Sequence, residues 1–263
     1  MKGVLSMRKH FTCLLALFLT LLLALPTLAD SIQLSADLTG TAVFPYDLSS
    51  PDGPAYTCTW CYPSIDPSEV CAEGINTFYT YLVTDANEFG NPITADDLFA
   101  RGVTDPSWSN ITYTLTCNNG EYLSLYLVNE SEIEGFHDKI WSAHTFSAED
   151  TSGTTVNLPK LLGLLSTGDA NDTWLEDRQT RKAEELVREL VWEQIELSAE
   201  DGVFDLFPDV DEELFSMIFW PEEDFWLDEN GDPVFFIQPG RIADESFGLL
   251  TFPISLEALT DEF

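Results

Sequence analysis

Hydrophobic and polar residues alternate along much of the middle and the last third of the chain, which predicts β-strands. The clearest signal is a β-hairpin, in which residues 111–117 and 122–128 alternate on either side of the turn Asn118-Asn119-Gly120. A second hairpin is expected around residues 228–231, where Asp, Glu, Asn and Gly separate two short apolar runs. The other strands expected from the pattern are residues 56–62, 141–146, 225–227, 234–237 and 248–254.

Two other segments place apolar residues three and four positions apart, which predicts helices. Residues 73–89 form the shorter one, and Gly90-Asn91-Pro92 is expected to end it. Residues 173–198 form the longer one, opened by a capping box of Thr173 and Glu176. Helices and antiparallel hairpins in this order indicate an α+β fold rather than a βαβ one, with an antiparallel sheet or sheets packed against one long amphipathic helix and a shorter N-terminal helix.

The first 29 residues have the parts of a secretory signal peptide. Lys2, Arg8 and Lys9 precede an apolar run over residues 11–25, and small residues lead to Ala29. The run is short for a membrane span, which needs about 20 residues, although an uncleaved anchor is the alternative. We expect cleavage after Ala29, a lead-in segment or edge strand over residues 30–54, and a single α+β domain over residues 55–263. The mature protein is then secreted or extracytoplasmic, with no stable membrane insertion.

The chain is strongly acidic. Its net charge is −35, and removal of the signal peptide, which holds three cations and no acid, would make it −38. Residues 201–263 contain 17 acids and the single cation Arg241. A negative field repels nucleic-acid phosphates, so no nucleic-acid partner is expected, and it attracts basic proteins. Solubility alone would also explain the charge.

Four cysteines remain after signal cleavage, and an even number in an exported chain predicts disulfides. Cys58 and Cys61 lie three apart on a strand and therefore point to opposite faces, so we do not expect them to bond to each other. Cys71 and Cys117 are the expected partners, with the pairing left open. A four-thiolate zinc site, a redox pair and free thiols are the alternatives.

Few residues point to catalysis. The two histidines after the signal, His137 and His144, are seven apart, which fits no helical metal face, and we expect neither a metal nor another cofactor. Carboxylates beside aromatic residues could form a glycosidase pair, and the candidates are Glu132, Glu134, Glu222, Glu223 and Asp224. The run Asp228, Asn230, Asp232 departs from a calcium loop and is better explained as a hairpin turn.

Several short motifs resemble an extracytoplasmic domain family. They are Cys61-Tyr62-Pro63, Gly74-Ile75-Asn76, Tyr122-Leu123-Ser124-Leu125, Gly135-Phe136-His137, Gly153, and residues 156–162, 225–231, 235–239 and 247–254. Together they resemble the DUF3298/DUF4163-like domain that is found in a lysozyme-binding anti-sigma factor and before the catalytic part of peptidoglycan deacetylases. The likeness covers residues 55–263. Two departures are Phe136, which stands where the family usually has glycine, and Gly240-Arg241 after Pro239.

The resemblance implies recognition of cell-wall glycan or of a wall-active protein, which is basic lysozyme for the anti-sigma factor. We therefore expect an exported, non-catalytic binding module of the bacterial cell envelope. Its expected binding surface contains Gly135, Phe136, His137, Trp141, Trp220 and Trp226. The alternatives are a cell-wall polysaccharide hydrolase that uses paired carboxylates and a plain structural protein of the envelope.

Overall fold

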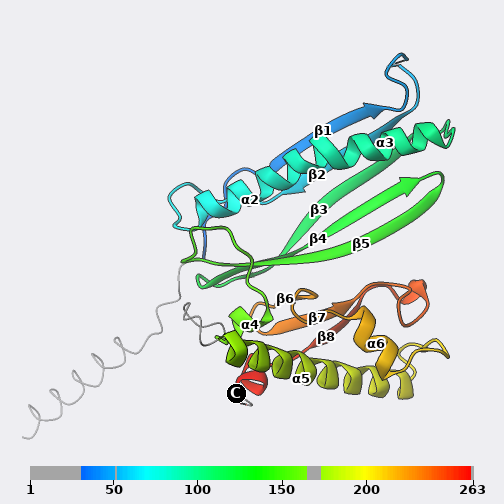
Figure 1. Cartoon of the computed structure of the whole chain (residues 1–263). Helices are drawn as coiled ribbons and strands as arrows, with labels where there is room; N and C mark the ends of the chain where they lie inside the picture. The colour runs from blue at the N-terminus through cyan, green and yellow to red at the C-terminus, as the bar shows by residue number, and fades with distance from the viewer. Residues whose placement is uncertain (1–30, 51, 165–172, 262–263) are drawn as a thin grey trace, which may run out of the picture. The chain divides into compact units, whose positions relative to one another are not determined.

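The computed structural model describes residues 31–50, 52–164 and 173–261. Residues from Ser31 onward form one compact unit. The expected signal peptide, residues 1–29, and the side chains of the expected capping box lie outside the described part. The fold class is α+β, as predicted, with a five-stranded sheet, a three-stranded sheet and several helices (Figure 1).

The five-stranded sheet has its strands side by side in chain order. They are β1 (Leu38–Pro45), β2 (Ala55–Tyr62), β3 (Ser107–Asn118), β4 (Tyr122–Ile133) and β5 (Phe136–Ser147). β1 is an edge strand, which settles one of the two readings of the lead-in segment. The predicted hairpin around Asn118-Asn119-Gly120 is confirmed as β3 and β4, and both strands are longer than the alternation indicated.

The connection between β2 and β3 departs from the sequence-based expectation. These two strands are parallel, and the helices α2 (Ala72–Asp85) and α3 (Asn91–Ala100) form the crossover between them. The chain therefore contains the βαβ unit that the element order had argued against. A π-helical turn, Ala86–Gly90, joins α2 to α3, so the expected break at Gly90 was wrong. Pro92 lies in the first turn of α3, where a missing backbone N–H costs little.

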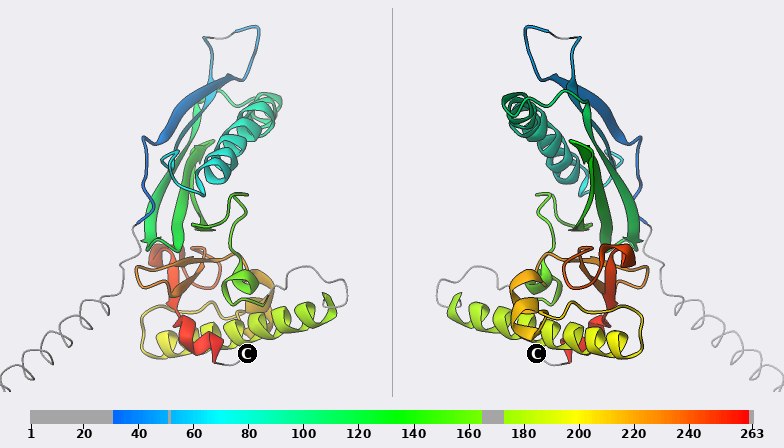
Figure 2. Two further views of the ribbon diagram at one scale, coloured as in Figure 1. Left: turned by 90° about the vertical axis from the view of Figure 1, so that its left-hand side faces the viewer. Right: turned by 90° about the vertical axis from the view of Figure 1, so that its right-hand side faces the viewer.

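The two helices cover one face of the five-stranded sheet, as Figure 2 shows. Alternate residues of β2, among them Tyr56, Cys58 and Tyr62, are buried beneath them. α2 contributes Ile75 and Tyr79, both fully buried, because apolar residues three and four apart share one helix face.

The second layer contains the three-stranded sheet, whose strands are β6 (Phe225–Leu227), β7 (Pro233–Ile237) and β8 (Leu250–Pro253). Both pairs are antiparallel, and the hairpin expected around residues 228–231 is confirmed. The helical segments of this layer are α4 (Leu158–Leu161), α5 (Thr173–Glu200), α6 (Glu212–Ile218), the 3-10 turn Glu245–Phe247 and α7 (Leu256–Thr260). Ala183, Val187, Val191 and Ile195 of α5 are fully buried in one core with β6 and β7.

Specific polar bonds join the two layers. The Ser124 hydroxyl of β4 bonds the Thr145 hydroxyl of β5 at 2.7 Å and accepts the Leu227 N–H of β6 at 2.8 Å. Nearby, the ring of Trp226 lies 5.1 Å from that of Tyr126. β6 therefore packs on the end of the five-stranded sheet, against β4 and β5 and, to a lesser extent, β3.

The expected disulfides are absent among the described residues, where all four cysteines are free thiols. The reason is their distribution, since each of the three buried thiols belongs to a different part of the core. Cys58 lies with Tyr56 and α3, Cys71 with α2, and Cys117 with the core of the second layer. Cys61 is on the other face of β2, with its Sγ 3.6 Å from Asp37 Oδ2.

No helix in the described ranges is both long enough and apolar enough to cross a lipid bilayer.

Candidate functional site

A cavity of about 420 Å³ opens where β5 meets the second layer. One wall is β5 itself, from Trp141 to Thr145, with Phe78 of α2 beside it. The segment 222–225, directly before and at the start of β6, forms the facing wall, and residues 154–157 close one side. Its volume is within the range of small-ligand sites, about 300–1,000 Å³.

Three successive carboxylates, Glu222, Glu223 and Asp224, make the cavity acidic. Burial, together with the charges of Glu223 and Glu222, raises the pKa of Asp224 to about 6, although the Trp220 N–H opposes the shift by donating to its Oδ2 at 3.0 Å. The described residues that line the cavity include no lysine or arginine. Its negative charge is therefore not balanced from within.

A fourth carboxylate lies behind this wall, on α5. Burial and the neighbouring charge of Glu222 raise the pKa of Glu184, and an ion pair of 3.4 Å with Arg188 only partly offsets them. Glu222 Oε2 is buried without a hydrogen-bond donor. Acids thus crowd together here, with Arg188 as the cation that contacts Glu184.

The opposite wall carries a neutral histidine. His144 Nδ1 lies 3.3 Å from the hydroxyl oxygen of Tyr79, and the ring contacts Phe78 and Phe146 edge-on. Burial lowers the pKa of His144 to about 4, so this side chain is uncharged at pH 7 and does not neutralise the acids across the cavity.

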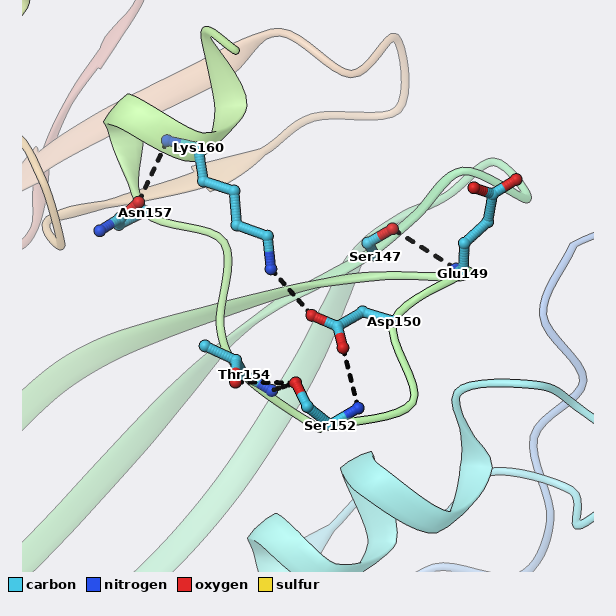
Figure 3. A network of polar contacts seen from close by, with 7 residues as sticks. All are labelled: Ser147, Glu149, Asp150, Ser152, Thr154, Asn157 and Lys160. Carbon is cyan, nitrogen blue, oxygen red and sulfur yellow. Dashed lines mark hydrogen bonds and ion pairs between the residues drawn. The ribbon is translucent and has the colours of Figure 1, made fainter. Parts of the chain in front are cut away.

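The loop between β5 and α4 is held in shape by a network of side chains (Figure 3). Asp150 accepts from the Ser152 N–H at 2.8 Å and from Lys160 Nζ at 2.8 Å. Ser152 Oγ donates to the Thr154 hydroxyl at 2.8 Å, and the Asn157 side chain caps α4 by accepting from the Lys160 N–H at 3.1 Å. Lys160 therefore ties both ends of the loop together, and residues 154–157 are positioned as the cavity's side wall.

The same loop touches α2 through two glycines. A Cβ at Gly74 or at Gly153 would overlap the backbone of the other residue, and Gly153 has a φ of +72°. Both positions belong to the motifs on which the family resemblance was based. Glycine is required here because two backbones meet without room for a side chain.

Trp141 is fixed in the cavity wall by an unusual partner. Gln238, after β7, accepts from the Trp141 N–H at 3.0 Å and donates to its carbonyl at 2.7 Å. One side-chain amide thus pairs with the edge of β5 as a neighbouring strand would. Trp141 also lines a second hollow, of about 580 Å³, together with residues 137–139, 239, 244–246, 248 and 249.

The expected binding residues are not gathered in one place. Gly135 and Phe136 are at the β4–β5 turn, with a φ of +77° for Gly135 and 78% exposure for Phe136. His137 and Trp141 follow on β5. Trp220 is 53% exposed and lies before the acidic wall, whereas Trp226 is 8% exposed and stacks on Phe236 at 5.3 Å. Trp226 thus belongs to the core and offers little surface for a ligand.

The carboxylates considered for a hydrolase lie apart from one another. Glu134 is at the β4–β5 turn in a 2.7 Å ion pair with Arg101, and Glu132 pairs across the strands with His137. Glu222, Glu223 and Asp224 share one wall of the cavity, and no carboxylate is among the described residues of the facing wall. A glycosidase needs two carboxyl groups that flank the scissile bond, and the candidates that line this cavity all come from one segment.

The acidic run at 228–232 is a turn, as its sequence indicated. Asp228 Oδ1 accepts the N–H groups of Asn230 and Asp232 at 2.8 and 3.0 Å. The Asp232 carboxylate accepts from the Leu256 N–H at 2.7 Å. These carboxylate oxygens accept hydrogen bonds from backbone N–H groups. The bonds of Asp228 close the hairpin, and the bond of Asp232 holds the start of α7.

Gln238 and Glu184 were not identified from the sequence. Gln238 lies within the family motif 235–239, so that motif was a signal for its position but not for its role. Glu184 is one of several acids on a charged helix, and nothing in the spacing sets it apart.

This arrangement of helices and strands is similar to that of solved structures. A DUF3298 family member from Bacteroides fragilis aligns with a TM-score of 0.53 at 13% identity, over 87% of this chain and 93% of the other. The chain shares the DUF3298 fold. A DUF3298 family protein from Pseudomonas aeruginosa aligns less closely, with a TM-score of 0.45 at 13% identity, over 88% of this chain and 94% of the other.

No family model matches the sequence, and no curated protein matches it. The likeness to the DUF3298 structures therefore concerns the fold, and the function has to be argued from the cavity.

Proposed function

We propose that the chain is an exported, non-catalytic binding module of the bacterial cell envelope that recognises a basic, wall-active protein of the lysozyme type. The observation that carries the proposal is the acidic cavity, which has three carboxylates on one wall and no lysine or arginine among its described lining residues. A lysine or arginine side chain of a partner would supply the missing positive charge.

The cavity combines the two features that such a side chain needs. Trp141 and Phe78 offer aromatic surface for the aliphatic stem, and a cation over an aromatic ring gains about 0.5–2 kcal/mol. Glu223 is exposed at the wall and Asp224 is half-buried, so a bound cation would meet one accessible and one sheltered carboxylate. Burial strengthens the second contact, because water screens it less.

The charge of the whole chain would act over a longer range. A net charge of −35 attracts a basic protein and accelerates the encounter, while the cavity gives a specific place for one of its side chains. Export is part of the same proposal, since the basic and apolar pattern of residues 1–29 would bring the module to the compartment where wall-active proteins act.

The test is calorimetric titration of the compact unit Ser31–Phe263 with lysozyme, at 50 and 150 mM salt. We expect saturable one-to-one binding that persists at 150 mM. The double variant Glu223→Gln, Asp224→Asn should weaken binding at least tenfold, because it removes the charge that faces the cation.

A matched control is Glu193→Gln, Glu196→Gln, which makes the same change in net charge at two exposed positions of α5. This variant should bind within twofold of the unmodified protein. Equal loss in both double variants, or binding that vanishes at 150 mM salt, would mean that only the overall charge matters and would contradict the proposal.

A further inference from the structure

The five-stranded sheet has an open face. α2 and α3 cover one side, and on the other no described helix or strand lies over β1 and β2 (Figure 2). At β5, the segment around residues 239–249 borders the open face. Strand pairing arranges the side chains of the open face in rows that run across the sheet. One row is Val43, Thr57, Trp108, Glu132 and His137, and the next is Thr41, Thr59, Asn110, Glu130 and Lys139.

The second of these, here called the polar row, has a hydrogen-bonding side chain on every strand. Thr59 donates to Asn110 Oδ1 at 2.6 Å. Glu130 Oε1 lies 2.9 Å from His137 Nε2 and 3.6 Å from Lys139 Nζ. Strand spacing of about 4.8 Å makes the polar row about 19 Å long. It is therefore an extended, partly preorganised line of donors and acceptors.

Two half-buried indole rings flank the polar row. Trp108 is two positions from Asn110 on β3, and its ring packs edge-on against His137 with centroids 6.2 Å apart. Trp141 is two positions from Lys139 on β5, with Lys139 Nζ 5.9 Å from its ring. These contacts hold the two rings at the sheet surface, and Gln238 holds the backbone of Trp141. The 580 Å³ hollow lies at the β5 end of the polar row.

Charge distinguishes the polar row from the acidic cavity, although Asp138, Asp244 and Glu245 line the hollow at its β5 end. In a chain of net charge −35, the Glu130 carboxylate is neutralised by Lys139 and contacted by His137. The polar row therefore lacks the uncompensated charge that would attract a basic protein. Its hydroxyl, amide and paired ionic groups suit an uncharged ligand that has many hydroxyl groups of its own.

We propose that the open face binds a neutral polysaccharide, which lies across the strands along the polar row. Sugar rings present C–H groups on one face, which pack on the faces of Trp108 and Trp141, while their hydroxyls exchange hydrogen bonds with Asn110, Glu130 and Thr41. This is a second ligand at a second surface, which shares Trp141 with the cavity proposed to bind a basic protein.

Co-sedimentation of Ser31–Phe263 with insoluble chitin and with cellulose tests the inference. We expect binding to at least one of them that is unchanged between 50 and 500 mM salt, because the contacts are uncharged. Trp108→Ala should reduce the affinity at least tenfold. Trp220→Ala removes an exposed tryptophan away from the open face and should change the affinity less than twofold.

A second pair of variants guards against misfolding of Trp108→Ala. Thr41 is exposed on the edge strand β1, so Thr41→Arg places a bulky side chain on the polar row without disturbing the core. It should reduce binding at least fivefold, whereas Thr84→Arg, exposed on α2, should leave it unchanged.

Three results would overturn the inference: no binding to either polysaccharide, binding that collapses with salt, or equal loss in Trp108→Ala and Trp220→Ala. Two variants distinguish this proposal from the binding of a basic protein. The Glu223→Gln, Asp224→Asn variant should still bind polysaccharide, and Trp108→Ala should still bind lysozyme, because Trp108 does not line the cavity.

Discussion

The layer of the five-stranded sheet and the layer of the three-stranded sheet both have closed apolar cores, yet they treat buried polar groups differently. In the first, the polar groups are neutral: Asn76 bonds both the N–H and the carbonyl of Ile65, and Asn118 does the same for Ile32. The buried polar atoms without a partner in this layer are neutral too, namely Trp60 Nε1, Ser107 Oγ and Thr116 Oγ1. In the second, Glu184 and Glu222 lie close together, with an unpartnered carboxylate oxygen.

This difference separates stability from function. A side-chain amide whose donor and acceptor are both hydrogen-bonded to the backbone fixes that backbone and has no free group to bind a ligand. Crowded carboxylates oppose the folded state at neutral pH, and a cation that reaches them would relieve the repulsion. The layers should therefore respond differently to mutation and to pH.

The largest effect is expected where the connecting loop meets α2. Gly153→Ala would force a Cβ into the backbone of Gly74 and strain a residue at a φ of +72°. Overpacking and left-handed strain together should lower the free energy of unfolding by about 3–4 kcal/mol, measured by urea denaturation. Gly163→Ala is the control, since Gly163 has a φ of +65° and open space around it, and it should cost about 1 kcal/mol. Similar losses in both would show that the close approach contributes nothing.

Acid titration should bring out the contrast between the layers directly. The pKa of Asp224 is raised from 3.8 to about 6, so its contribution to stability is fully present below pH 3.8 and is lost as the pH rises through 6. The pKa of His144 is lowered from 6.5 to about 4, so its contribution is present above pH 6.5 and is lost as the pH falls through 4. Each shift corresponds to about 3 kcal/mol, and the two oppose each other between pH 4 and 6.

Single variants should separate the pH dependence of stability caused by Asp224 from that caused by His144. Relative to the unmodified protein, Asp224→Asn should gain about 3 kcal/mol between pH 4 and pH 7, and His144→Gln should lose a similar amount over the same range. Urea unfolding at pH 4, 5, 6 and 7 measures both. Differences that do not vary with pH would show that neither group is perturbed in the folded protein.

The sequence predicted the strands better than the connections between them. Alternation and turn residues mark the β3–β4 hairpin and the second-layer strands, because those signals are local. Gly90-Asn91-Pro92 has the composition of a helix stop, but a π-helical turn carries the chain through it into α3. Cysteine count suggested disulfides, whereas burial in separate parts of the core decided the outcome.

The site was predictable only in pieces. Trp141 and the acids at 222–224 were each identified from the sequence, but about 80 residues separate them, and no local pattern reports that β5 faces this segment. Glu184 and Gln238 act through contacts with distant segments, from α5 and after β7. Such roles depend on tertiary packing, which residue spacing does not encode.

The two hydrogen bonds between the Gln238 side chain and the Trp141 backbone offer a test with a smaller expected effect. Gln238→Glu replaces the amide that donates to the Trp141 carbonyl with an oxygen that repels it, which should cost about 2 kcal/mol. Hydrogen exchange of the Trp141 amide should quicken. Gln194→Glu is the control, because Gln194 makes a single exposed bond of 3.3 Å to the Pro253 carbonyl, and it should change stability little. Unchanged exchange at Trp141 would show that Gln238 does not hold the edge of β5.

The smallest expected effect concerns the loop wall of the cavity. Asp150→Asn removes the ion pair with Lys160, which is partly exposed, so the loss should be about 0.5–1 kcal/mol at pH 7. Bonds from Lys160 and Ser152 hold the pKa of Asp150 below its usual value, so its stabilising contribution is present above pH 3.8 and disappears in stronger acid.

Asp66 provides the comparison for this prediction. It accepts from the Ser68 N–H as Asp150 accepts from the Ser152 N–H, and it accepts from the Ser68 hydroxyl where Asp150 has the lysine. Asp66→Asn should therefore destabilise less than Asp150→Asn at pH 7, and 500 mM salt should narrow the gap by screening the Lys160 pair. If the two variants lose the same stability at low salt, the turn alone holds the loop and Lys160 adds nothing to the cavity wall.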